Sequence, residues 1–158
     1  MRFPLDGDVE VPWGRQFPGG FGAQRKHDIH TGVDLYTSEG SLVYALEPGV
    51  VVVVEDFTGP KAGSPWWLET MALLVEGERG VICYGEIVTN HAVGDLIHEG
   101  MIIGEVRRVL RNDKGLPTAM LHFELYDKGT RKSVVWGLDE PWPKDCEIQR
   151  IFCLKRRV

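Results

Sequence analysis

The chain has 158 residues, 43% of them hydrophobic, and a formal net charge of −5. This length and composition suit one globular domain over residues 1–158, which would bury on the order of 70% of its unfolded surface. The acidic balance argues against a nucleic-acid partner, because such a surface needs clustered excess lysine and arginine. No apolar run approaches the length of a membrane span, and the N-terminal residues lack the apolar core of a signal peptide.

In chain order, apolar periodicity predicts strands over residues 50–55, 72–75, 81–84, 102–103, 105–110, 121–125 and 148–154. The second and third flank a loop with two glycines able to take positive φ, which predicts a hairpin. A turn is expected over 112–115, and residues 136–142 are expected to pack over one end of the sheet. Nineteen glycines and nine prolines interrupt the pattern at the spacing of an all-β fold, a single-domain antiparallel β-sandwich or open barrel.

The three cysteines, Cys83, Cys146 and Cys153, are odd in number, lie far apart and form no CxxC pair. We therefore expect reduced thiols, as in the cytosol, rather than a disulfide framework. The sequence pattern does not indicate an oligomeric state.

Three residues read together as a metal site: His30 and Asp34, four positions apart around Gly32, and His122. Two imidazoles and one carboxylate can hold zinc and leave a fourth position open for water, as in a catalytic zinc site. A bend at Gly32 can turn both of its neighbours toward one ion. Period-two alternation places His122 and Glu124 on one face of a strand, with apolar residues on the other. The alternative is that each histidine is an ordinary surface residue.

The segments around these residues resemble the lysostaphin-type zinc endopeptidases, the LytM-like (glycyl-glycine endopeptidase) enzymes that cut peptide cross-links in bacterial cell walls. The resemblance covers about residues 17–125 and leaves 126–158 as a C-terminal extension. Its motifs occur in the family's order: Phe-Gly at 21–22, HxGxDL at 30–35, then 40–45, 49–51, 94–97 and HFEL at 122–125. It implies that His30, Asp34 and His122 bind Zn2+, and that the partner is a peptide or peptidoglycan fragment.

The chain departs from that family at the two histidines that do not bind the metal. Where the family has Tyr-x-His, this chain reads Tyr84-Gly85-Glu86, and Met120 replaces the first histidine of the family's HxH. In the family, these imidazoles move protons and stabilise the oxyanion. We therefore expect weak or absent hydrolysis. His91, in the loop after Glu86, is a further candidate to replace the missing imidazole.

Three roles remain open for Glu86: general base for a metal-activated water, fourth metal ligand, or solvated loop residue. Met120 can neither donate a hydrogen bond nor carry a proton, so it indicates packing rather than chemistry. Tyr84 could supply a hydroxyl to the groove if its strand continues through Gly85.

Trp66 and Trp67 lie in an expected loop between strands, where adjacent tryptophans either form a stacking wall for a peptide or sugar or cap a small core. Two functions follow: a zinc endopeptidase with Glu86 as base, or a non-catalytic protein that keeps the metal and groove and only binds its partner. A biotinyl or lipoyl carrier is excluded because no lysine stands at the required hairpin tip. A cell-wall substrate lies outside the cytosol, so the protein would be cytoplasmic with another target, or released by lysis or processing.

Overall fold

The computed structural model describes residues 1–12, 14–25, 29–112 and 119–133. Within them the chain forms one short 3-10 helix, η1 (Pro60–Ala62), and the strands β1 (Val33–Tyr36), β2 (Leu42–Tyr44), β3 (Gly49–Thr58), β4 (Thr70–Gly77), β5 (Gly80–Val88), β6 (Leu96–Ile97), β7 (Ile102–Val106) and β8 (Met120–Tyr126). Most of the predicted turn at 112–115, the segment 136–142, the strand 148–154, Cys146, Cys153 and most of the C-terminal extension lie outside the described residues. In the described part of the chain, no helix is long and apolar enough to cross a membrane.

The strands predicted over 50–55, 72–75, 81–84 and 121–125 are confirmed as β3, β4, β5 and β8, each longer than expected. The two strands predicted over 102–110 are one strand, β7, which ends at Val106. Strands β1, β2 and β6 were not predicted. They have two to four residues each, too few for an alternation to be recognised.

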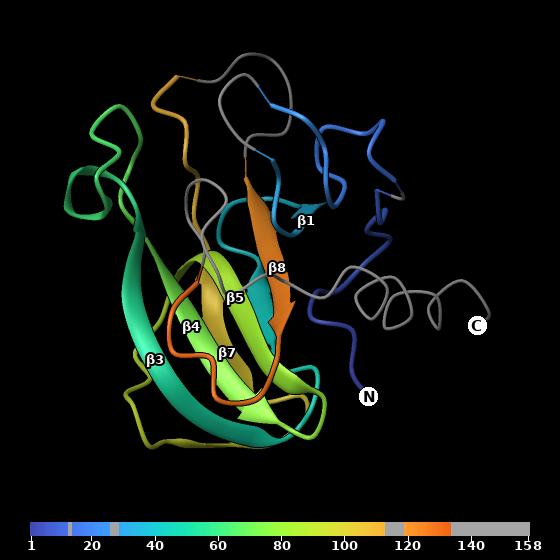
Figure 1. Cartoon of the computed structure of the whole chain (residues 1–158), viewed down its shortest axis with the longest axis vertical. Coiled ribbons are helices and arrows are strands. Elements are labelled where there is room, and N and C mark those ends of the chain that lie inside the picture. The colour runs from blue at the N-terminus through green and yellow to red at the C-terminus, as the bar shows by residue number, and fades with distance from the viewer. Residues whose placement is uncertain (13, 26–28, 113–118, 134–158) are drawn as a thin grey trace.

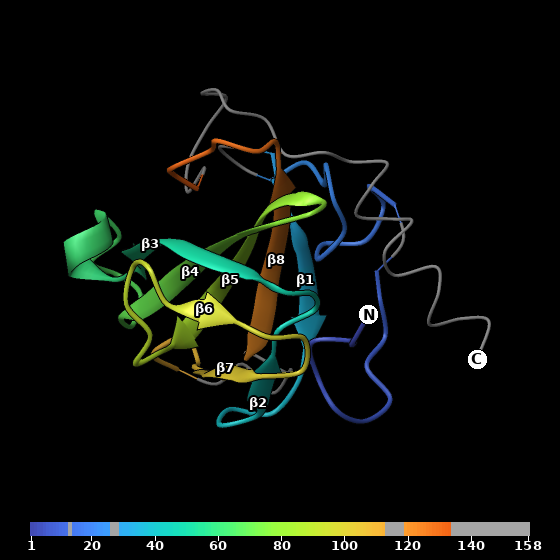
Figure 2. The ribbon, with the colours of Figure 1, turned by 90° about the horizontal axis from the view of Figure 1, so that it is seen from below.

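All strand pairs are antiparallel, and the sheet has the order β1-β8-β5-β4-β3-β6, with β7 pairing both β2 and β5. Figure 1 shows β3, β4, β5 and β8 side by side in one curved layer. In Figure 2, β7 and β2 lie below β4 and β5 in the view, and β6 lies between β3 and β7, so these three short strands form a second layer. The fold is therefore all-β and antiparallel, an open sheet that bends over itself, as the sequence predicted.

The main hydrophobic core lies between these two layers. It joins side chains from the short strands, such as Val43, Ile97 and Ile103, to side chains from the long ones, such as Ile82 and Phe123. A smaller cluster on the opposite face of β4, β5 and β8 includes Phe57, Leu74, Val81, Cys83 and Tyr126. Each long strand is thus apolar on both faces along part of its length, which leaves little room for polar side chains unless they are paired.

Residues 127–133 cover part of the smaller cluster. In Figure 1 this segment follows β8 and passes in front of β4 and β5. The backbone amide of Gly129 donates to Glu76 at 2.7 Å, and the amide of Ser133 donates to Glu55 at 3.2 Å. Cys83 is a buried free thiol beneath this segment, and burial raises its pKa well above the usual range.

Candidate metal centre

Pairing of β1 with β8 places two of the predicted ligands opposite each other, because Asp34 is the register partner of His122. Their neighbours Val33, Leu35 and Phe123 point into the main core, so alternation directs both ligand candidates to the other face of the sheet. His30 precedes β1 and joins them there. All three side chains are buried, with exposed fractions of 3–6%.

The ligand atoms of these residues converge closely. The Asp34 Oδ1 atom lies 3.1 Å from His30 Nε2 and 2.9 Å from His122 Nδ1, and the two nitrogens are 3.2 Å apart. Four donors arranged tetrahedrally around zinc at about 2.0–2.1 Å would lie about 3.3 Å from one another. Among the described residues, this is the group of histidine and acidic side chains that could hold a metal ion.

Hydrogen bonds on the far side of each imidazole fix which nitrogen faces inward. His30 Nδ1 lies 2.8 Å from the carbonyl oxygen of Gly20, which can only accept, so Nδ1 carries the hydrogen. His122 Nε2 lies 2.8 Å from the carboxylate of Glu124 and donates to it in the same way. In the neutral imidazoles, the lone pairs of His30 Nε2 and His122 Nδ1 therefore both face Asp34. Three acceptors with no donor between them suit a cation that prefers nitrogen and oxygen ligands.

The electrostatics of the metal-free site agree with this arrangement. Burial alone would lower the pKa of His122, but its bonds to Asp34 and Glu124 raise that pKa to about 10. Burial would raise the pKa of Asp34, yet the positive charge of His30 and the hydrogen bonds of both histidines hold it below its usual range. The carboxylates of Asp34 and Glu124 thus favour a positive charge beside them.

Glu124 holds His122 in position, a role that the sequence analysis did not assign. Its side chain is fully buried, and it accepts hydrogen bonds from Thr31 Oγ1 at 2.6 Å and from the Tyr126 hydroxyl. Gly32 lies directly beside this pair: a Cβ there would come within 2.8 Å of His122 Nε2 and 2.9 Å of Glu124 Cγ. The glycine between the two ligand candidates is thus required by close packing and not by a left-handed backbone.

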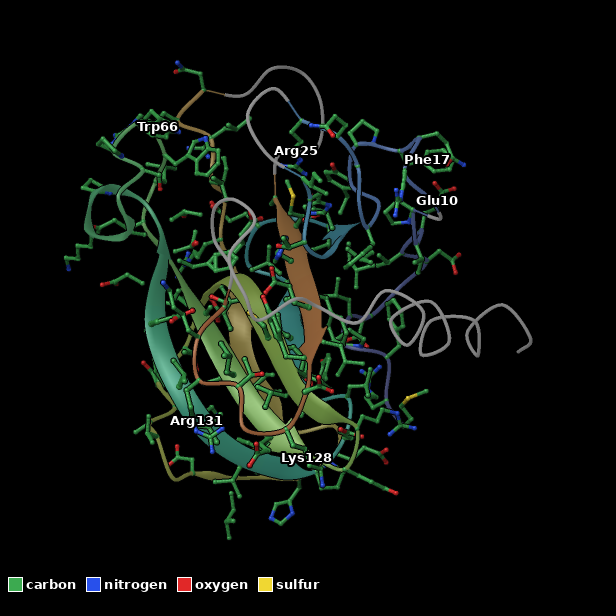
Figure 3. The ribbon with its side chains drawn as sticks, viewed as in Figure 1. Glu10, Phe17, Arg25, Trp66, Lys128 and Arg131 are labelled. Carbon is green, nitrogen blue, oxygen red and sulfur yellow. The ribbon has the colours of Figure 1, made fainter. Side chains whose placement is uncertain are left out.

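A second residue that sequence reasoning missed is Arg25. Its Nη2 atom donates to Asp34 Oδ2 at 3.2 Å and to the carbonyl of Pro18 at 3.1 Å, while 40% of the side chain stays exposed. Figure 3 shows Arg25 near the end of β8 that begins at Met120. Nearness to His30 in the sequence was its only signal, since no spacing rule relates an arginine at this distance to a metal ligand.

Glu86 is the extra residue of a β-bulge. Met71 of β4 pairs with Ile87 and Ala72 pairs with Gly85, which leaves Glu86 unpaired. Its φ of 61° lies in the left-handed region that side chains rarely adopt. Because of the bulge, Ile87 instead of Glu86 enters the main core after Tyr84. The carboxyl group is thereby freed from the core face.

The Glu86 carboxyl group lies within electrostatic reach of the cluster. Burial, and then the negative charge of Asp34, raise its pKa to about 8, against smaller opposing effects of His122 and Arg25. Its Oε2 atom is buried and has no hydrogen-bond partner among the described residues. The carboxyl group does not belong to the set of converging ligand atoms. This combination of burial, strain and a raised pKa is typical of acid–base groups.

Of the residues predicted to line a groove, Tyr84 lies in the core and Met120 lies on the face of the metal cluster. Tyr84 is fully buried, and its hydroxyl accepts a hydrogen bond from the Leu46 amide at 3.0 Å, so it belongs to the core and not to a groove. The condition set for Tyr84 was that its strand continues through Gly85, and β5 does so, but the bulge at Glu86 then interrupts the alternation. Met120 is half-buried on the same strand face as His122 and is the register partner of Tyr36.

Tyr36 extends this face of β1 beyond Asp34, and 38% of it is exposed. Burial and the charges of Asp34 and Glu86 raise the pKa of its hydroxyl, while Arg25 lowers it. The phenol therefore lies among the charged groups of the site. No motif or spacing in the sequence marked it as a site residue.

Trp66 and Trp67 lie between η1 and β4, in the loop where they were expected, with ring centroids 6.1 Å apart in a T-shaped arrangement. Trp66 is 58% exposed, and Figure 3 shows it on the same end of the molecule as Arg25. Their role as a groove wall stays a prediction. His91, the other candidate imidazole, lies 2.9 Å from Asp95 in its own loop.

No protein-family profile and no curated protein sequence matches the chain. Solved structures do. The catalytic domain of EnpA, a prophage-encoded M23 protein of Enterococcus faecalis, solved as a point mutant, is 21% identical over 91% of this chain and 94% of that domain, with a TM-score of 0.57. The catalytic domain of the antimicrobial peptidase lysostaphin from Staphylococcus simulans is 18% identical over 88% and 90%, also with a TM-score of 0.57.

A Pseudomonas aeruginosa protein described as a peptidase of the M23 family is 17% identical, with a TM-score of 0.51. It matches 79% of this chain, which spans only 44% of that protein's length. The similarity to EnpA and lysostaphin, in contrast, extends over nearly the whole of both domains. The chain therefore has the fold of the M23, lysostaphin-type metallopeptidase domains, and it carries on that fold a cluster of two histidines and one aspartate that could hold a metal ion.

Proposed function

We propose that this protein is a zinc-dependent peptidase of the lysostaphin type, acting on short peptides such as bacterial cell-wall stem peptides. The observation that carries the proposal is the convergence of His30 Nε2, Asp34 Oδ1 and His122 Nδ1 within 3.2 Å of one another on this fold. Two nitrogens and one oxygen form a donor set that zinc prefers. In this proposal, residues 1–158 form one domain with its core over about 17–125.

The three ligands leave one position open, which distinguishes a catalytic from a structural zinc site. Zinc held there would supply a Lewis acid that polarises a peptide carbonyl and acidifies a water molecule. Glu124 and the Gly20 carbonyl keep both imidazoles in the ligating orientation. The ring of Phe57, whose centroid lies 5.2 Å from that of His122, excludes water from one side.

Glu86 is the general base in this proposal. Its carboxylate accepts the proton of the attacking water and returns it to the amine nitrogen of the leaving peptide, so no net proton is gained or lost. A carboxyl group whose pKa lies near neutrality performs both transfers more readily than one that is always ionised. The bulge is what brings this residue to the site, since regular alternation would point it into the core.

Hydrolysis should be slower than in a relative with both imidazoles. Met120 offers no donor to a developing oxyanion, and the loss of one such donor typically costs about a hundredfold or more in rate. The same observation supports the second candidate function, a protein that holds zinc and binds a peptide without cleaving it.

One experiment on the purified chain addresses both candidates. After dialysis, elemental analysis should find close to one zinc per chain in the wild type and almost none in His122→Ala. Equal zinc content in the two proteins would contradict the site. With zinc bound, slow release of amines from purified peptidoglycan supports the peptidase. Peptide binding without any release supports the binding protein.

A further inference from the structure

One face of the β1–β8 pair carries more than the metal ligands. The rung next to Asp34 and His122 consists of Tyr36 and Met120, which are register partners. Val33 and Leu35 on β1, and Leu121 and Phe123 on β8, point into the main core. Alternation therefore places Tyr36 and Met120 on the face of the cluster.

Tyr36 is exposed, and its ring lies against the same backbone segment as Asp34. A Cβ placed on Gly19 would lie 3.3 Å from the Tyr36 hydroxyl and 3.2 Å from Asp34 Cβ. Both side chains thus border the same buried stretch of backbone at Gly19, where a larger residue would collide with the Tyr36 ring. The charges of Asp34, Arg25 and Glu86 all act on the Tyr36 hydroxyl.

Peptide hydrolysis needs a hydrogen-bond donor at the carbonyl, and neither the three metal ligands nor Glu86 acting as a base supplies one. When water adds to a peptide carbonyl, its oxygen becomes an oxyanion, and fixed donors that face it stabilise the transition state. On this rung Met120 has no donor, whereas a phenol has one O–H group. The Nη2 atom of Arg25, the nearby cation, is directed at Asp34 and the Pro18 carbonyl.

We propose that Tyr36 is a catalytic residue whose hydroxyl donates a hydrogen bond to the oxyanion formed at the scissile carbonyl. The phenol keeps its proton throughout, so the step involves no transfer of atoms or electrons from Tyr36. The proposal rests on the proposed function, because it concerns the same site and the same class of peptide substrate.

The test compares Tyr36→Phe with Tyr44→Phe in the zinc-loaded protein. Tyr44 is a control from outside the site, because it lies on β2 and its hydroxyl donates a hydrogen bond to Asp6. Two probes are used: a glycine-rich phosphinic peptide, which carries a tetrahedral anionic group, and the same peptide with an ordinary amide. Binding is measured by calorimetry, and zinc content and melting temperature are recorded for each variant.

Tyr36→Phe should weaken binding of the phosphinic peptide roughly tenfold to a hundredfold, and lower kcat by a similar factor. Affinity for the amide peptide, KM and zinc content should not change. Adding Met120→His to Tyr36→Phe should restore part of the loss, because an imidazole at position 120 would place a donor on the same rung.

The proposal is overturned if Tyr36→Phe weakens binding of the phosphinic peptide no more than Tyr44→Phe does. It is also overturned if Tyr36→Phe weakens binding of both peptides equally. Failure of the proposed function gives a different result. If the wild type cleaves no peptide but binds the phosphinic peptide more tightly than Tyr36→Phe does, the proposed hydrolysis is refuted and the role of Tyr36 as a hydrogen-bond donor is supported. If the protein cleaves peptide and Tyr36→Phe does not change the rate, the proposed hydrolysis is supported and the role of Tyr36 as a donor is refuted.

Discussion

Replacing Glu86 with glutamine should stabilise the metal-free protein at neutral pH. The folded chain keeps a proton on Glu86 up to about pH 8, whereas a solvated glutamate loses it near pH 4.5. Between these values the folded state binds more protons than the unfolded state, so the free energy of unfolding falls as pH rises through the window. Glutamine does not ionise, and Glu86→Gln should remove this dependence.

The size of the effect follows from the raised pKa. One pKa unit corresponds to about 1.4 kcal/mol, so at pH 7.5 keeping Glu86 protonated in the folded state lowers the free energy of unfolding by about 2–4 kcal/mol once partial solvation is allowed for. For a chain of this length each kcal/mol shifts the melting temperature by about 2–4 °C. We expect the metal-free variant to melt roughly 5–10 °C above the wild type at pH 7.5, with a much smaller difference at pH 5.

Calorimetry of both metal-free proteins at the two pH values measures this difference, with Glu105→Gln as a surface control. The zinc-loaded variant then separates the roles of Glu86. A general base predicts retained zinc and hydrolysis reduced by about 10²–10⁴-fold. A fourth ligand predicts weaker zinc retention. A variant no more stable than wild type at pH 7.5 would refute the burial argument, and unchanged stability, zinc and hydrolysis would mean that Glu86 is a solvated residue.

Two further substitutions test the support around the ligands. Glu124→Gln should weaken zinc binding about 10–100-fold, because the charge that orients His122 is lost. The control Glu47→Gln, which changes a buried carboxylate paired with Arg79, should leave zinc binding unchanged. Equal zinc affinities of the two variants in a chelator competition would count against the role of Glu124. Gly32→Ala should destabilise the protein by about 1–3 kcal/mol in urea unfolding, since its methyl group would lie 2.6 Å from the Phe123 carbonyl; wild-type stability would show that the chain relaxes there.

The face of the strand on which His122 lies could be predicted from the sequence because alternation is a local property. In β8 the apolar residues at 121, 123 and 125 fix the face of His122 without knowledge of any other strand. The partner of β8 could not be predicted, since β1 has only four residues. That pairing is nevertheless what places Asp34 opposite His122.

The residues around the ligands were less predictable because they depend on breaks in the pattern. Glu86 is the unpaired residue of a bulge, and although Gly85 is a residue type common at bulges, it does not show which neighbour is left unpaired. Tyr84 is in the core because regular alternation from Ile82 places it there, and the bulge then separates its face of the strand from that of Glu86. Arg25 reaches Asp34 from outside the strands, where no periodicity operates.

The position of β1 at the end of the sheet has a consequence for how the protein would respond to metal supply. Its only strand partner among the described residues is β8. Terminal strands open locally more easily than central ones. An ion bound by His30, Asp34 and His122 would link the edge strand to its neighbour, and binding to the closed form alone lowers the population of the open form. Amide exchange in residues 33–36 would then slow as zinc is added, while exchange in β4 and β5 would change little. Local unfolding at this edge, and with it access for proteases, would therefore decrease as the concentration of free zinc rises.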